Sequence, residues 1–99
     1  MIKGTTPTHI YTLPFDTSLV KSVRITYAQS GKVILTKETD KCTLEGNKVV
    51  ITLTQEETLK FSTEIVQIQV RVLTLGNEAL SSHVYRKGIY ECLDGEVLK

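Results

Sequence analysis

Hydrophobic and polar residues alternate along much of the chain, most regularly in the stretch 64–73, EIVQIQVRVL. Successive side chains of a β-strand point to opposite faces, so this stretch has one apolar face and one polar face, whereas a helix would scatter its apolar residues. The pattern predicts an antiparallel strand that lies on a core with its other face in water. The residues of the apolar face are Val66, Ile68, Val70 and Val72.

The same alternation, together with β-branched residues, predicts further strands. The predicted strands are 9–13, 21–28, 32–38, 41–45, 48–54, 64–73 and 79–92, with tight turns at Ser30-Gly31, Gly46-Asn47 and Gly76-Asn77. In the second and fifth strands the inward residues are expected to be Val23, Ile25, Tyr27, Val49, Ile51 and Leu53. The first strand has apolar residues on both faces, so its inward face stays open.

The last predicted strand, 79–92, is long and contains a glycine. Leu80, Ser82 and Val84 share one of its faces, and Gly88 indicates a bulge or a break. In total the chain has about seven short strands at spacings of roughly 8 to 12 residues, which favours an all-β fold, either a β-sandwich or a small barrel.

A short helical turn is predicted where the alternation stops after the fifth strand. Thr54 is followed three residues later by Glu57, the spacing of a capping box, in which each side chain bonds the other residue's backbone amide. The apolar pattern ends too soon for a long helix, so we expect a single turn that links strands of two sheets. Leu59 and Phe61 are then expected to fill the core below it.

Length and composition fit one domain. The 99 residues, 1–99, are enough for one core without metal or disulfide. A hydrophobic share of 40% without tryptophan suits two thin sheets. Segment 1–7 is expected to be an N-terminal arm, and segment 93–99 a loosely held tail with solvated acidic residues. The net charge of +1 gives no field that attracts nucleic acid or an anionic membrane, so we expect neither as a partner.

Targeting signals and cysteines give expectations about the compartment. The N-terminal residues lack the apolar stretch of a signal peptide, and no apolar run approaches the ~20 residues of a membrane span. We therefore expect the chain to be made in the cytosol. In that compartment Cys42 and Cys92 are expected to be free thiols.

No pattern typical of catalysis or of metal binding is recognisable. His9 and His83 have no ligand-spaced partner, so we expect no metal and no cofactor. Neither cysteine lies beside a glycine-rich turn or a helix start, and both are expected to act as small apolar residues. Glu56 and Glu57 are adjacent on the predicted turn and are expected to complement its dipole. We therefore expect that the chain is not an enzyme.

Two sets of side chains are candidates for a nucleic-acid surface, but both have a plainer interpretation. Tyrosines can stack on bases, yet in a small sandwich they more often form the rim of the core, and the cations alternate with glutamates. Contacts with other proteins remain, because an edge strand can accept a strand from a neighbour and an arm such as 1–8 can supply one. The residues concerned are Tyr11, Tyr27, Tyr85, Tyr90, Arg24, Lys37, Arg71, Arg86 and Lys87, with Glu38, Glu64, Glu78 and Glu91 interleaved.

Three segments together resemble a known family. They are GTTPTHIYTLPFDTSLVKSVRITYAQ, then CTLEGN with VVITLTQEETLKF, then VQIQVRVLT leading to CLDGEVL. They resemble short proteins encoded in phage and prophage regions of Gram-positive bacteria, among virion structural genes. The LTQEET turn followed by the QIQVRV strand is also similar to the N-terminal β-sandwich domain of phage baseplate upper proteins. The first resemblance covers nearly the whole chain, the second only its last half.

The resemblance implies an Ig-like antiparallel β-sandwich that serves as an accessory or assembly module of a phage particle. It carries no catalytic motif. It implies contacts with other phage structural proteins and with further copies of the chain, made first in the bacterial cytoplasm and then in the virion. The alternative from the residues is a small carbohydrate- or ligand-binding module, which would align its tyrosines on one open face.

Overall fold

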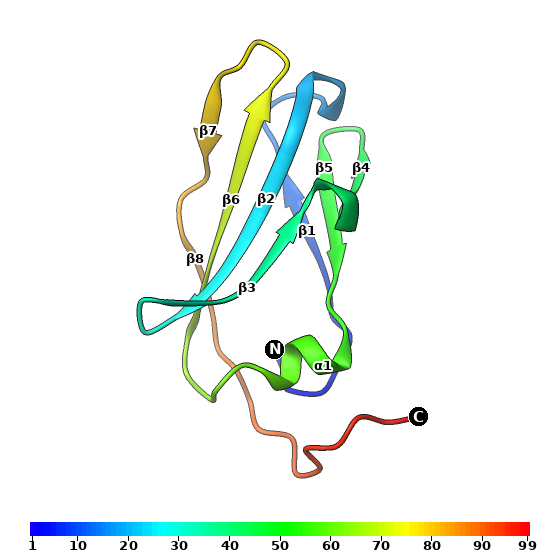
Figure 1. Cartoon of the computed structure of the whole chain (residues 1–99), viewed down its shortest axis with the longest axis vertical. Coiled ribbons are helices and arrows are strands. Elements are labelled where there is room, and N and C mark those ends of the chain that lie inside the picture. The colour runs from blue at the N-terminus through cyan, green and yellow to red at the C-terminus, as the bar shows by residue number, and fades with distance from the viewer.

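The computed structural model describes all residues, 1–99, and is mostly β: eight strands form two antiparallel sheets with one short helix (Figure 1). The strands are β1 (Thr8–Thr12), β2 (Val20–Gln29), β3 (Lys32–Glu38), β4 (Thr43–Glu45), β5 (Lys48–Thr52), β6 (Val66–Thr74), β7 (Ala79–Ser81) and β8 (Tyr85–Lys87). The helical elements are the 3₁₀ turns η1 (Thr17–Leu19) and η2 (Thr39–Lys41) and the helix α1 (Gln55–Leu59).

The two sheets differ in size. The small sheet has the order β1-β5-β4, and the large sheet has the order β3-β2-β6-β7, with β8 also paired to β6. In the view of Figure 1, β4 and β5 stand on one side of β2, and β7 and β8 stand on the other. The sheets pack face to face as in a sandwich, with β1 at a free edge of the small sheet.

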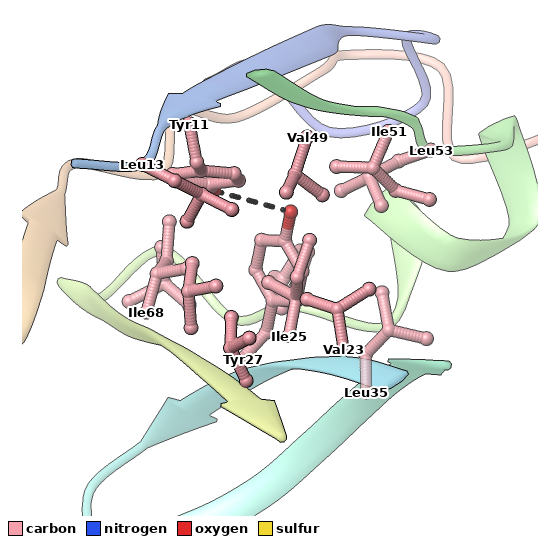
Figure 2. Packing of buried hydrophobic residues seen from close by; sticks show 14 of the residues in the cluster. Tyr11, Leu13, Val23, Ile25, Tyr27, Leu35, Val49, Ile51, Leu53 and Ile68 are labelled. Carbon is pink, nitrogen blue, oxygen red and sulfur yellow. Dashed lines mark hydrogen bonds between the residues drawn. The ribbon is translucent and has the colours of Figure 1, made fainter. Parts of the chain in front are cut away.

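The core lies between the sheets and takes every second residue from each (Figure 2). All four predicted inward residues of β6 are buried, as are those of β2 and β5, so the predicted apolar faces are confirmed. On β1 the inward residues are His9 and Tyr11, while Ile10 is 59% exposed. The cluster consists of Tyr11, Leu13, Val23, Ile25, Tyr27, Leu35, Val49, Ile51, Leu53, Phe61, Val66, Ile68, Val70, Val72 and Ile89.

The helix α1 confirms the predicted capping box and the predicted link between the sheets. The Glu57 amide donates to the Thr54 hydroxyl at 3.2 Å, and the Thr54 amide donates to the Glu57 carboxylate at 2.8 Å. Phe61 fills the core as expected, but the expectation for Leu59 is wrong because Leu59 is only half-buried. Thr58 is buried in its place, and its hydroxyl donates to the Thr5 carbonyl at 2.8 Å.

The single strand predicted for 79–92 is wrong, because the structure has two strands of three residues there, β7 and β8. The interruption is at Ser82. Its hydroxyl accepts a hydrogen bond from the Val70 amide at 3.0 Å and donates to the His83 carbonyl at 2.8 Å. A side chain thus takes the place of a backbone group and ends the regular pairing. Leu80 and Val84 are consequently exposed rather than part of the core.

Both end segments of the chain form hydrogen bonds with the sandwich. The Tyr90 amide donates to the Met1 carbonyl at 2.8 Å, and the Lys3 amide donates to the Tyr90 carbonyl at 3.1 Å. Leu98 exchanges two bonds with the side-chain amide of Gln55 on α1, at 2.8 and 3.1 Å. The first residues therefore lie beside the segment after β8 and not beside β1.

Candidate functional site

The outer edge of β1 carries free backbone groups. No strand of the chain pairs with this side of β1, whereas the other side pairs with β5. The Leu13 amide donates to a carbonyl of the β4–β5 turn at 2.7 Å, and the Pro7 carbonyl accepts an amide beyond β5 at 3.0 Å. Residues of an antiparallel pair alternate between bonded and non-bonded positions. The backbone N–H and C=O groups that point to the open side therefore belong to Thr8, Ile10 and Thr12.

A groove of about 370 Å³ runs between this edge and the large sheet. Val70 and Val72 of β6 form its floor, because the small sheet does not extend over this part of the inner face. One wall is β1 with the turn after it, including Phe15. The other wall is β7, where Leu80 contributes an exposed side chain. The groove is thus bordered by the free edges of both sheets.

A second hollow, of about 430 Å³, continues the groove toward β8. The two hollows share Tyr11, Thr12 and Tyr85, and the second adds Ile10, Arg86 and Lys87. No carboxylate lines either hollow, and neither of these two cations forms an ion pair. The groove is therefore apolar at one end and positively charged at the other.

Aromatic rings connect the two sides of the groove. The ring centroids of Tyr11 on β1 and Tyr85 on β8 are 5.6 Å apart. The ring centroids of His83 and Tyr85 are 4.3 Å apart. These rings, with the methyl groups of the floor, provide surface for apolar packing and for an extended backbone.

A polar cluster lies behind this wall, inside the core. The His9 Nδ1 atom is 2.8 Å from the Tyr27 hydroxyl, which is 3.4 Å from the Tyr11 hydroxyl, the contact drawn as a dashed line in Figure 2. Burial raises the pKa of both tyrosines. Burial lowers the pKa of His9, and the positive charge of Lys87 lowers it further. The cluster is therefore neutral and ties β1 to β2.

The stability of the protein is expected to fall as the pH falls from 7 to 5. The folded chain holds the pKa of His9 below its ordinary value of 6.5, so the unfolded chain binds this proton more readily. The contribution of neutral His9 to the free energy of unfolding is complete above about pH 6.5, and it is lost as the pH drops through the pKa of His9 in the folded chain. Thermal melts measure this, since each kcal/mol lost lowers the Tm of such a domain by roughly 4–8 °C.

His9→Gln removes this titration, and we expect its Tm to change much less over the same range. His83→Gln is the matched control, because His83 is exposed and its variant should keep the wild-type pH dependence. The partners of Glu57 lower its pKa from the ordinary value of 4.5 despite its burial. Its titration therefore changes the stability only below about pH 4.5 and does not affect the comparison between pH 7 and 5. A wild-type Tm that is constant between pH 7 and 5 would contradict the buried, neutral state of His9.

The cations do not form the basic face that we considered from the sequence. Lys37 points into the protein and forms an ion pair with Glu57, with only 10% of its side chain exposed. Burial works to raise the pKa of Glu57, but the bonds from Lys37 and from Thr54 outweigh it and lower the pKa. Arg24 pairs with Glu38 at 2.8 Å on the surface. Arg71 lines a separate hollow together with the Arg24–Glu38 pair, whereas Arg86 and Lys87 lie at the groove and form no ion pair.

The tyrosines and cysteines are also dispersed. Tyr27 and Tyr11 are buried and Tyr90 is exposed, so the tyrosines do not form one row on an open face. Cys42 and Cys92 are unpaired and half-buried. Burial raises the pKa of the Cys42 thiol, which keeps it protonated and unreactive. No group of three or more His, Cys, Asp or Glu side chains is arranged to hold a metal ion.

Comparisons with known proteins add no assignment. The chain matches no protein-family model, no curated protein and no solved structure. None of its helices has the length and apolar character needed to cross a membrane. The groove and the free edge of β1 are therefore interpreted from their own geometry.

Proposed function

We propose that the protein is a non-enzymatic structural or assembly module of a phage or prophage virion that binds, along β1, an extended segment of another chain, either a different virion protein or a further copy of itself. The observation that carries this proposal is the free edge of β1 beside an apolar groove. Backbone groups of an edge strand give affinity to an added strand, and pockets for alternate side chains give specificity. The virion context comes from the resemblance of the three sequence segments.

The order of the strands supports a binding position for one additional strand. In an Ig-type sandwich one sheet has the order A-B-E-D, and the other contains C, F and G. If β1, β5 and β4 correspond to B, E and D, then β2, β6 and β7 correspond to C, F and G, with β3 at the outer edge of this second sheet. Under this Ig-like assignment no strand of the structure occupies the position of strand A beside β1. A partner that supplies it would fill the groove and cover Leu80, which is exposed on its wall.

Ile10→Pro is expected to weaken binding to the virion protein that the chain contacts by at least about tenfold in Kd. Proline removes the Ile10 amide, which points to the open side, without breaking a β1–β5 bond. Ile10→Thr keeps this amide and a β-branched side chain, so it should bind within about threefold of wild type. Biolayer interferometry against each purified head, tail and baseplate protein encoded beside the gene measures these affinities.

Leu80→Asp tests the opposite wall of the groove and should weaken the same interaction, because it places a charge on an apolar contact. Circular dichroism establishes that each variant keeps the β-sheet spectrum. Binding neither to these proteins nor to a second copy of the chain, or equal binding of wild type and both groove variants, would contradict the proposal.

A second candidate function is the binding of a small carbohydrate or other ligand. The groove volume of about 370 Å³ falls within the range of small-molecule sites, which span about 300–1,000 Å³. Tyr11 and Tyr85 supply rings on which a sugar could stack. Binding on a glycan array that Tyr85→Ala abolishes and Ile10→Pro leaves intact would favour this candidate over the first.

A further inference from the structure

We propose that the segment bound along β1 is residues 93–99 of a second copy of the chain. This inference rests on the proposed function and specifies its partner. One copy would add its C-terminal segment as a strand to the small sheet of the next, so that contacts repeat from copy to copy. The segment, the groove and their charges each support this pairing.

The segment 93–99 carries leucine side chains that its own sandwich leaves exposed. Leu93 is fully exposed, Leu98 is 73% exposed and Val97 is half-buried, and the hydrogen bonds from the segment to the rest of the chain are the two between Leu98 and Gln55. In an extended conformation Leu93 and Val97 fall on one face, with Gly95 between them. That face can enter the apolar end of the groove, while the other face, with its two carboxylates, stays on the solvent side, where Arg86 and Lys87 are exposed.

The charges of the segment and of the groove are complementary. Asp94 and Glu96 form no ion pair within the chain, and Arg86 and Lys87 form none at the groove. No carboxylate lines either hollow, so nothing there repels an acidic segment. Complementary charges of this kind fix the register and direction of an added strand.

The segment is long enough to span β1, and the path of the chain favours a second copy over the same copy. Seven extended residues span about 23 Å, and the five residues of β1 span about 17 Å, at about 3.3 Å per residue. Within one chain, the course after β8 leads away from the groove to Gln55 on α1, at the lower end of the molecule in Figure 1. A contact between two different surfaces is heterologous and produces a ring or a filament.

Sedimentation velocity of the full chain over a concentration series tests the inference. Wild type is expected to self-associate, and higher salt should weaken the association because it screens the charges. Asp94→Lys/Glu96→Lys and Arg86→Glu/Lys87→Glu should each weaken it by at least about tenfold. An equal mixture of the two variants should associate again, since each supplies the charge that the other requires. Asp40→Lys/Glu45→Lys, with the same change in net charge away from the groove, should behave like wild type.

A wild type that stays monomeric at every concentration, or self-association that both charge reversals leave unchanged, overturns the inference. If the chain stays monomeric but binds a virion protein in a manner that Ile10→Pro abolishes, then the second copy is the wrong partner and the proposed function stands. If it neither self-associates nor binds such a protein, both proposals are overturned.

Discussion

Ile68→Ala is expected to lower the free energy of unfolding by about 2–5 kcal/mol, because it removes buried methyl groups and leaves a cavity. Ile68 lies in the centre of the large sheet, where it pairs with Tyr27 on β2 and Tyr85 on β8, and its side chain is fully buried. Its neighbours belong to strands of both sheets, so the cavity cannot close by movement of a loop. Chemical denaturation followed by circular dichroism measures the change.

Gln67→Ala is the matched control for this substitution. Gln67 is the neighbouring residue of β6 and points to the polar face. Its substitution should therefore lower the free energy of unfolding by well under half as much as Ile68→Ala. Natural domains have a total stability of only about 5–15 kcal/mol, so Ile68→Ala should also melt at a much lower temperature. Equal stabilities of the two variants would mean that the assigned inner face of β6 is not the core.

Glu57→Gln is expected to destabilise the protein by about 2–3 kcal/mol. Removal of one partner of a buried ion pair costs about 3–5 kcal/mol, because it leaves the other charge without compensation, and the exposed part of Glu57 reduces this cost. The ammonium of Lys37 would then lie beside the core with only a neutral amide. Glutamine can still accept the bond from the Thr54 amide, so the substitution changes the charge and leaves the helix cap in place.

Glu56→Gln is the control, since Glu56 is adjacent on α1, is exposed and forms no ion pair. The Glu56→Gln substitution should lower the free energy of unfolding by less than about 0.5 kcal/mol. The double variant Lys37→Met/Glu57→Gln should recover part of the loss, because it no longer contains a buried charge. A Glu57→Gln variant as stable as Glu56→Gln would show that Lys37 and Glu57 do not pair in solution.

The alternation in the sequence was sufficient to predict the strands that form the core. It identified the inner faces of β2, β5 and β6, and the capping box identified α1, because both signals depend on residues close together in sequence. It did not resolve β1, where Ile10 is as apolar as the inward residues and only the pairing with β5 decides which face is inside. It also missed the break at Ser82, because a hydroxyl that replaces a backbone partner on β6 has no local signature.

The candidate site could not be predicted from the sequence for a related reason. The groove exists because the small sheet is narrower than the large one, and the number of strands in each sheet depends on pairings between distant segments. Lys37 illustrates the same limit. In sequence it is one polar residue among others on β3, and its burial becomes understandable only when α1 brings Glu57 to it.

Hydrogen exchange of single amides, measured by NMR on the free and the bound chain, tests the role of the β1 edge most directly. In the free chain the amides of Ile10 and Thr12 should exchange rapidly, while those of His9 and Tyr11, bonded to β5, should be protected. When the partner segment binds, Ile10 and Thr12 should become protected as well. If these two amides exchange equally fast with and without the bound partner, no strand is added to β1 and the proposed mode of binding is wrong.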